Sequence, residues 1–166
     1  MAVRVTFTPP EQLDLVKEIS RVSNQQSELT PRSQKSLAQA ALKGNLAQIY
    51  ESEKLIGWAL VEPLTKNLAE IGLVYIDPKF RSASTFNLLM KLVASRPERM
   101  LLATYDKDLI RYVRTVWRAK EITLWKAITL SRGKFLGKRM NLASLRAIGR
   151  KVKRSKPLIA VVGERN

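Results

Sequence analysis

The sequence predicts an α/β protein, because short apolar segments typical of strands alternate with segments whose apolar residues recur at helical spacing. Over residues 1–130 the expected order of elements is β-α-α-β-β-β-α-β-α-β. The chain has 166 residues, 45% of them hydrophobic, which is enough for one domain with a sizeable core. We therefore expect one folded domain over residues 1–130, followed by a basic C-terminal extension over residues 131–166.

The N-terminal part predicts one strand and two helices. Residues 3–8 alternate apolar with polar side chains, as a half-buried strand does, and Pro9 and Pro10 end this strand. We expect the second helix to begin with Thr30 as its N-cap and Pro31 at its first position, and to end at Gly44. The first helix carries an apolar stripe of Leu13, Val16, Ile19 and Val22.

The middle of the chain predicts a three-stranded meander, with strands at 46–50, 55–61 and 72–76. A helix is expected to begin near Ser84, a short strand at 100–104, and another helix after Asp106 as its cap. Alternating apolar residues from Glu121 to Leu130 then predict a long strand. The further segments expected are a short helix capped by Asn141, with Leu142, Leu145 and Ile148 on one face, and an apolar strand at 157–162, either a seventh strand of the sheet or part of a free appendage.

The segment Leu68–Phe86 joins a buried strand to a helix start through Asp77, Pro78 and Arg81. Residues Ser82, Ser84 and Thr85 are good N-cap types. The unpaired N–H groups and the dipole at the start of such a helix favour a phosphate group, and Arg81 adds a positive charge beside them. The junction therefore predicts a site for an anionic ligand.

Residues 74–86, V-Y-I-D-P-K-F-R-S-A-S-T-F, resemble the acyl-CoA-binding signature of the GNAT superfamily of N-acyltransferases. Pro78, Phe80 and Arg81 match the family's Pro, aromatic and Arg, whereas Ser84 and Phe86 stand where the family has small residues that admit the pyrophosphate. The resemblance implies a mixed, splayed sheet of six to seven strands flanked by about four helices, and acetyl-CoA or another acyl-CoA as cosubstrate. The residues that it implies for cofactor binding are Val74, Tyr75, Ile76, Arg81, Ser82, Ala83, Ser84, Thr85 and Phe86.

Two residues are candidates for proton transfer during acylation of an amine. Glu70 resembles the glutamate that many GNAT enzymes use as a base at the start of this strand, and the alternative is a surface carboxylate at a strand end. Tyr112 resembles the tyrosine that protonates the departing thiolate, although Val116 and Trp117 replace the Gly-Phe pair that follows it in the family. The alternative for Tyr112 is a core or rim residue of an amphipathic helix.

Composition excludes several other chemistries. The chain contains no Cys and no His, so it has no thiol nucleophile, no disulfide and none of the commonest metal-binding side chain, and we expect no metal. No apolar run approaches the ~20 residues of a membrane span, and residues 1–8 lack the pattern of a signal peptide. We expect a soluble cytoplasmic protein that does not bind membranes and is a monomer or homodimer.

The net charge of +16 indicates polyanionic partners. Residues 131–166 hold eleven Lys or Arg and one acid, Glu164, so DNA, RNA or a ribosome is the expected contact of this extension; the alternative is a solvated basic surface. Trp58, Trp117 and Trp125 are candidates for base stacking or for core packing. The first function hypothesis is an N-acyltransferase, and the second is a non-catalytic or nucleobase-modifying GNAT-fold protein that binds DNA or RNA through its tail.

Overall fold

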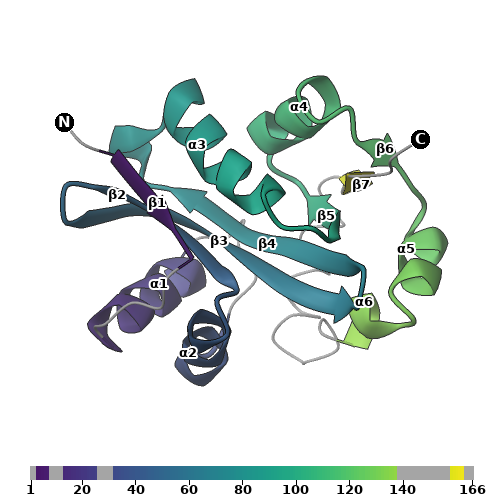
Figure 1. The fold of residues 1–166 in the computed structure, drawn as a ribbon, viewed down its shortest axis with the longest axis horizontal. Helices are drawn as coiled ribbons and strands as arrows, with labels where there is room; N and C mark the ends of the chain where they lie inside the picture. The colour runs from purple at the N-terminus through teal and green to yellow at the C-terminus, as the bar shows by residue number, and fades with distance from the viewer. Residues whose placement is uncertain (1–2, 8–12, 26–31, 138–157, 163–166) are drawn as a thin grey trace. The chain divides into compact units, whose positions relative to one another are not determined.

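The computed structural model describes residues 3–7, 13–25, 32–137 and 158–162 (Figure 1). The chain forms two compact units. The first unit comprises Met1–Glu62 and Gly72–Pro97, and the second comprises Pro63–Ile71 and Glu98–Asn166. Strands β3 (Lys54–Thr65) and β4 (Leu68–Ile76) each contribute residues to both units.

The first unit contains an antiparallel arrangement of β1 (Val3–Thr6), β2 (Leu46–Glu51) and β3. The register between β2 and β3 shifts at Ile49 and Tyr50, where β3 carries an extra residue. The predicted N-terminal strand and the first two of the three strands of the meander are thus confirmed, with β3 longer than expected because its apolar pattern continues to Leu64.

Helices cover both faces of the strands of the first unit (Figure 1). Helices α1 (Leu13–Gln25) and α2 (Gln34–Leu42) pack together on one face, and α3 (Ala83–Ala94) lies against β1 and β2 on the other. Of the predicted stripe of α1, Val16 and Ile19 are buried in this core and Val22 is half-buried, and the side chain of Leu13 lies outside the described residues. The remaining buried residues of the core on the α1 and α2 side are Leu37, Ala40, Ala41, Leu46, Trp58, Leu60 and Leu73.

The start of α2 differs from the prediction. Its N-cap is Ser33, whose hydroxyl oxygen accepts a hydrogen bond of 3.2 Å from the Ser36 N–H, and the predicted cap and first residue, Thr30 and Pro31, lie outside the described residues. Ser33 is as good an N-cap type as Thr30, because its hydroxyl oxygen can accept a hydrogen bond from an N–H group of the first turn. The sequence thus contains two cap-type residues, and the second of them is the cap. The end of α2 is as predicted, because Gly44 has φ +65° and its N–H donates to the Ala41 carbonyl oxygen at 2.9 Å.

The second unit contains β5 (Arg99–Thr104), β6 (Lys120–Glu121) and β7 (Leu158–Val162). Strand β5 is parallel to Leu68–Ile71 of β4 and antiparallel to β7, which pairs with β6 on its other side. The apolar segment near the C-terminus is therefore the seventh strand of a sheet rather than a free appendage. Among the described residues the seven strands follow the order β1-β2-β3-β4-β5-β7-β6, which confirms a mixed sheet.

The predicted long strand over Glu121–Leu130 is wrong. Only Lys120–Glu121 pair as a strand, and Leu124–Leu130 form helix α5 with Thr123 as N-cap. Residues 124, 127, 128 and 131 share one face of a helix, and buried Ala127 and Ser131 follow this spacing. The alternation of isoleucine and leucine is typical of a strand, and the prediction relied on these large apolar residues. The buried positions of the helix carry the small residues Ala127 and Ser131, which a search for large apolar side chains does not find.

Helix α6 (Lys134–Gly137) follows α5, and the helix predicted after Asn141 lies outside the described residues. The core of the second unit brings together Leu64, Leu68, Leu101, Ala127, Phe135 and Val161. The division of the chain at residue 130 stays a prediction. Within the part of the chain that the structure describes, no helix combines the length and the apolar character needed to cross a membrane.

Candidate functional site

The junction from β4 to α3 has the predicted strand, turn and helix. Asp77 closes the turn, because its Oδ1 accepts a hydrogen bond of 3.0 Å from the Lys79 N–H, and Pro78–Phe80 form one turn of 3₁₀-helix (η1). Helix α3 then begins with Ser82 as its N-cap. The sequence offered three cap-type residues, and the first of them is the cap.

Hydrogen bonds at the start of α3 determine which backbone N–H groups remain for a ligand. The Thr85 N–H donates to Ser82 Oγ at 3.1 Å, and the Phe86 N–H donates to the Ser82 carbonyl oxygen at 3.0 Å. The N–H groups of Ala83 and Ser84 have no acceptor within the helix, because they belong to its first two residues. A ligand at this helix end would therefore meet the backbone of Ala83 and Ser84 rather than that of Thr85 and Phe86.

Three hydroxyl groups gather at the same helix end. Ser82 Oγ lies 2.8 Å from Ser84 Oγ and 2.8 Å from Thr85 Oγ1. The side chains of Ser82 and Ser84 are exposed, and those of Thr85 and Phe86 are half-buried. Ser84 thus keeps its hydroxyl at the surface, in a hydrogen bond with Ser82 Oγ in which either hydroxyl could be the donor.

Positive charge surrounds this turn. Arg81 and Lys79 are exposed directly before α3. The Lys54 ammonium lies 3.8 Å from Asp77 Oδ2 and 4.9 Å from the centre of the Phe80 ring, so the single acid of the turn is paired with a cation. Cations, a helix N-terminus and hydroxyl donors together fit a phosphate or diphosphate group.

The backbone of β4 is irregular just before this turn. The parallel ladder with β5 covers Leu68–Ile71 on β4, and Leu73 then has φ +49°, a left-handed conformation that costs a non-glycine residue about 1–2 kcal/mol. A Cβ added to Gly72 would meet nothing within 4 Å. The parallel ladder thus ends at Ile71, before the residues Val74–Ile76 that the resemblance assigns to cofactor binding.

The three residues of β4 predicted to bind the cofactor arm also pack in the first unit. Ile76 is buried, and Val74 and Tyr75 are half-buried. The Tyr75 ring stacks on Trp58 with centroids 4.5 Å apart, and burial raises the pKa of the Tyr75 phenol above its ordinary value. The side chains of β4 therefore serve the core, which leaves its backbone as the part suited to a ligand.

Glu70 is a buried residue of β4, with 4% of its surface exposed, and it pairs with Leu101 of β5 in the second unit. The alternative of a surface carboxylate at a strand end is therefore wrong. A buried acid among apolar strand residues is uncommon and is a frequent feature of functional sites. The burial of Glu70 keeps it a candidate for proton transfer.

Tyr112 lies on α4 (Lys107–Thr115), also in the second unit. It is half-buried, and its ring meets the edge of Trp117 with centroids 5.6 Å apart. Burial raises the pKa of the Tyr112 phenol, and a hydrogen bond with Trp117 lowers it in part. The phenol is therefore protonated at neutral pH, as a proton donor must be.

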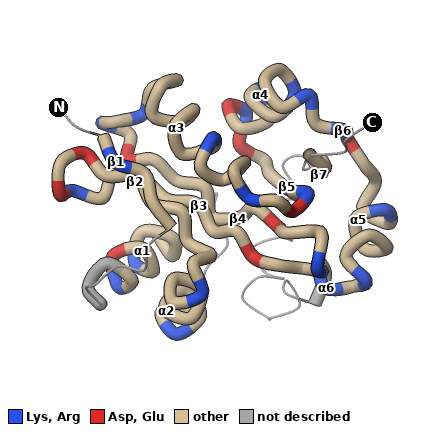
Figure 2. Tube along the Cα trace, viewed as in Figure 1, with Lys and Arg blue, Asp and Glu red and all other residues tan. Residues whose placement is uncertain are grey.

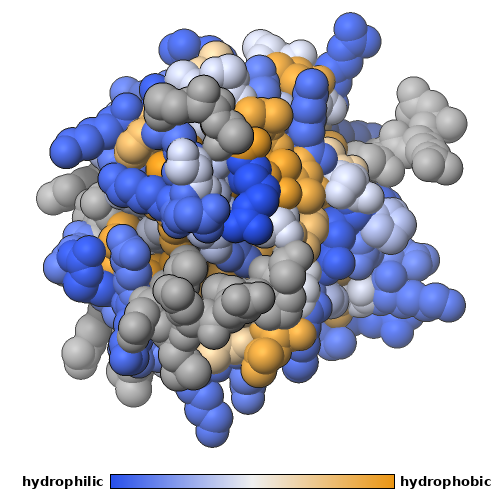
Figure 3. Space-filling view, turned by 60° about the vertical axis from the view of Figure 1, so that its left-hand side comes forward, coloured by the Kyte–Doolittle hydropathy of each residue, from blue (hydrophilic) through white to orange (hydrophobic). Residues whose placement is uncertain are grey.

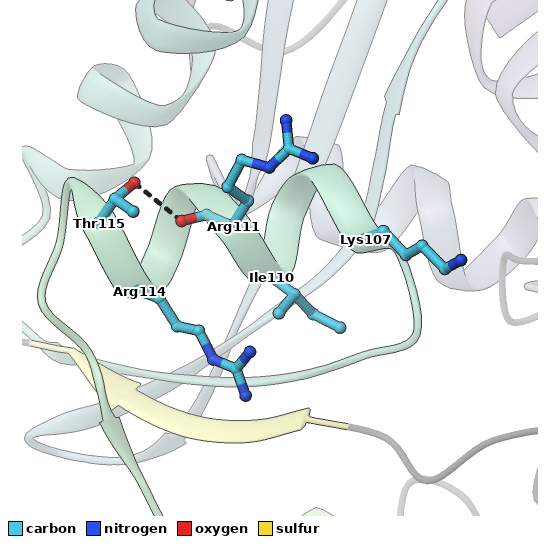
Figure 4. Close-up of a pocket in the computed structure, with 5 residues that line it drawn as sticks. All are labelled: Lys107, Ile110, Arg111, Arg114 and Thr115. Carbon is cyan, nitrogen blue, oxygen red and sulfur yellow. Dashed lines mark hydrogen bonds between the residues drawn. The ribbon is translucent and has the colours of Figure 1, made fainter.

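Helix α4 also carries a feature that the sequence analysis did not identify. A pocket of about 440 Å³ lies on its exposed side, lined by Lys107, Ile110, Arg111, Arg114 and Thr115 (Figure 4). Cations at positions i, i+4 and i+7 share one helix face, and this spacing was readable from the sequence.

Among the described residues, no group of three or more acidic side chains is placed to hold a metal ion.

Comparison with solved structures shows which proteins share this fold. No family model and no curated protein matches the sequence. Among solved structures, the chain is similar to N-acetylglutamate synthase from Neisseria gonorrhoeae in complex with coenzyme A and N-acetyl-glutamate, with 12% identity and a TM-score of 0.66, over 100% of this chain and 36% of that one. It is also similar to Rv2747 from Mycobacterium tuberculosis in complex with CoA, with 12% identity and a TM-score of 0.62, over 98% of each chain.

A third structure carries the family name itself. It is an acetyltransferase of the GNAT family from Staphylococcus aureus, with 13% identity and a TM-score of 0.57, over 75% of this chain and 88% of that one. At these identities the likeness concerns the fold alone. The chain therefore has the fold of the GNAT acetyltransferases, as its resemblance in sequence implied.

Proposed function

We propose that the protein is an acyl-CoA-dependent N-acyltransferase, most simply an N-acetyltransferase. The observation that carries the proposal is the start of α3, where the N–H groups of Ala83 and Ser84, exposed hydroxyl groups and Arg81 suit a diphosphate. Two solved structures with the same fold contain coenzyme A, which supports an acyl-CoA cosubstrate here.

Each candidate residue has a definite role in this proposal. The backbone of Val74–Ile76 pairs with the pantetheine arm as an added strand would, and one of its N–H groups polarises the thioester carbonyl. The nitrogen of the amine attacks the thioester carbon, and the carbon–sulfur bond breaks. Glu70 accepts the proton that the amine loses, and the Tyr112 hydroxyl donates a proton to the departing thiolate.

The acceptor is proposed to be an amine on, or bound to, a nucleic acid or ribosome. This part of the proposal is supported by the net charge of +16 and by the concentration of Lys and Arg in residues 131–166. We also propose that the protein works in the cytoplasm as a monomer or homodimer. The second candidate function is a non-catalytic or nucleobase-modifying GNAT-fold protein, favoured by Ser84 and Phe86 where the family signature has small residues.

Binding of acetyl-CoA tests the cofactor directly. We expect acetyl-CoA at millimolar concentration to raise the melting temperature, because a ligand at about 100 times its Kd stabilises the folded state by about 2.7 kcal/mol. Arg81→Glu should abolish this shift, and the matched charge reversal Lys35→Glu, on the exposed surface of α2, should retain it. If acetyl-CoA does not raise the melting temperature of the unmodified protein, the N-acyltransferase hypothesis is refuted and the non-catalytic GNAT-fold protein is favoured.

The proton-transfer roles need a separate measurement. We expect Glu70→Gln and Tyr112→Phe to keep the shift with acetyl-CoA but to release coenzyme A thiol about 10²-fold or more slowly in the presence of an amine acceptor. Full turnover by both variants would show that these residues do not transfer protons in the reaction.

A further inference from the structure

We propose that the exposed face of α4 and the segment that follows it, up to the start of α5, bind a single strand of nucleic acid. This surface, called the α4–α5 surface below, consists of exposed residues of Lys107–Lys126 in the second unit. In the sequence it lies outside the basic extension over residues 131–166. It requires no acyl transfer, so it is testable without acyl-CoA.

The first support is the arrangement of cations on α4. Lys107, Arg111 and Arg114 are exposed at positions i, i+4 and i+7 of α4 (Figure 4). Leu109 and Val113 of the same helix are buried. The third cation lies seven positions after the first, which is about 10 Å along the helix axis. This length spans more than one phosphate, because each strand of a duplex carries a charge every ~3.4 Å along its axis.

The second support is that these cations are only partly neutralised. Arg114 is paired, since its Nε and Nη2 both lie 2.7 Å from Glu121 Oε1. Within the described part of the chain, Lys107 and Arg111 make no ion pair. Among the residues described, Lys107 and Arg111 are therefore unpaired cations beside the paired Arg114. They line a pocket of about 440 Å³, in which they can bind anionic oxygens.

Positive charge continues beyond the helix. Figure 2 shows further Lys and Arg along the chain from α4 through β6 to α5. Both Arg118 and Lys120 are exposed, and Lys126 is exposed on α5. The acids among residues 107–126 are Asp108 and Glu121, of which the second is held by Arg114. A polyanion longer than one phosphate group suits this charge pattern.

The third support is Trp125, the second residue of α5, which has 78% of its surface exposed. Of the other two tryptophans, Trp58 is buried with 2% exposed and Trp117 is half-buried against Tyr112, so the structure separates the three candidates that the sequence left open. An exposed indole ring beside a lysine is suited to stacking on an unpaired base. Stacking requires a base outside a duplex, which favours a single strand.

The test measures binding of a fluorescein-labelled oligo(dT) of ~20 nucleotides to the full chain by anisotropy, without acyl-CoA, at several salt concentrations. We expect Lys107→Glu/Arg111→Glu to weaken binding about tenfold or more and to reduce the slope of log K against log salt by about 1.4, since each phosphate contact in a single strand contributes ~0.7. The control Lys35→Glu/Lys66→Glu changes the net charge equally at exposed sites outside the surface, and should keep the slope.

The stacking contact has its own readout. We expect oligo(dT) to quench tryptophan fluorescence, Trp125→Ala to remove most of the quenching and weaken binding about fivefold or more, and Trp125→Phe to retain most of the affinity. Melting temperatures of all variants should stay near that of the unmodified protein, and Lys107→Gln/Arg111→Gln provides a milder pair if the reversal impairs folding.

Three results would overturn the proposal. The first is oligonucleotide binding that neither the α4 variants nor Trp125→Ala weakens, which would assign binding to the extension. The second is that coenzyme A displaces the oligonucleotide and that the substitutions of Lys107 and Arg111 also weaken the binding of coenzyme A. This face would then be a phosphate site for the cofactor. The third is equal binding of duplex DNA without any effect of Trp125→Ala, which would leave Trp125 for contact with a protein.

Discussion

Gly57 lies where β3 passes close to β4 within the first unit. A Cβ at this position would lie 2.6 Å from the Tyr75 carbonyl oxygen and 3.0 Å from Ile49 Cγ2. Because the first of these atoms belongs to the backbone, the strand itself would have to move. We expect Gly57→Ala to lower the free energy of unfolding by about 1–3 kcal/mol, measured by urea denaturation.

Gly72 is the matched control for this substitution. It is also a glycine of the same sheet, but an added Cβ would meet nothing within 4 Å. We expect Gly72→Ala to leave the free energy of unfolding unchanged or to raise it slightly, because alanine restricts the unfolded chain. Equal losses in the two variants would show that the contact with Tyr75 does not explain the requirement for glycine at position 57.

Buried phenols make stability depend on pH in the alkaline range. Burial raises the pKa of Tyr50, Tyr75 and Tyr112 above the ordinary value of 10.0. The unfolded chain releases these protons near pH 10, whereas the folded chain retains them to higher pH, so the stabilisation is complete below pH 10 and is lost as pH rises through the folded pKa. We expect the melting temperature to fall as pH rises above 10.

A conservative variant isolates the phenol in this experiment. Tyr75→Phe keeps the ring that stacks on Trp58 but removes the ionisable group. Its melting temperature should fall less steeply above pH 10 than that of the unmodified protein. An identical pH profile in both proteins would mean that Tyr75 does not contribute to the loss of stability.

Single residues of the candidate site were predictable by type and position but not by environment. The sequence offered Ser82 as one of three cap-type residues, with Arg81 beside it, because both follow from local rules. It did not identify the burial of Glu70, which depends on the pairing of β4 with β5, residues about thirty positions apart. The assignment of Phe86 to cofactor binding came from the resemblance and stays a prediction, and the Phe86 N–H donates to the Ser82 carbonyl oxygen at 3.0 Å.

Among the secondary structure elements, α3 and α4 begin close to their predicted positions, whereas α5 was not predicted. Asp106 was predicted as a cap, and its Oδ1 accepts hydrogen bonds from the N–H groups of Asp108 and Leu109 at 2.9 and 3.0 Å. Ile122 and Thr123, directly before α5, and Ile128 within it are β-branched and therefore favour a strand by propensity. Burial of Ala127 against the second core outweighs this preference, which is a tertiary effect that local patterns do not contain.

The cap of α5 provides a test of this helix. The Thr123 hydroxyl accepts a hydrogen bond of 3.2 Å from the Lys126 N–H. We expect Thr123→Ala to lower the free energy of unfolding by about 1 kcal/mol and the melting temperature by about 2–4 °C, and Thr123→Ser, which keeps the hydroxyl, to have little effect. If Thr123→Ser lowered the free energy of unfolding as much as Thr123→Ala, the methyl group of Thr123 would be the stabilising part of the side chain and the capping hydroxyl would not.

The composition of the whole chain creates electrostatic repulsion in the folded state. The chain has 30 Lys and Arg against 14 Asp and Glu. Figure 3 shows that hydrophilic residues cover much of the face it presents. Ion pairs offset part of the repulsion, and that of Arg32 with Glu62, at 2.8 Å and with both side chains less than one fifth exposed, is well protected from salt.

Added salt should therefore stabilise the protein. The Debye length falls from about 30 Å at 0.01 M to about 8 Å at 0.15 M, which screens repulsion between distant like charges more than attraction within a close pair. We expect the melting temperature to rise with NaCl over this range, as measured by calorimetry. The variant Lys35→Glu/Lys66→Glu lowers the net charge from +16 to +12 and should show a smaller rise. A melting temperature that falls with salt would mean that ion pairs, rather than the excess of positive charge, dominate the electrostatic free energy of folding.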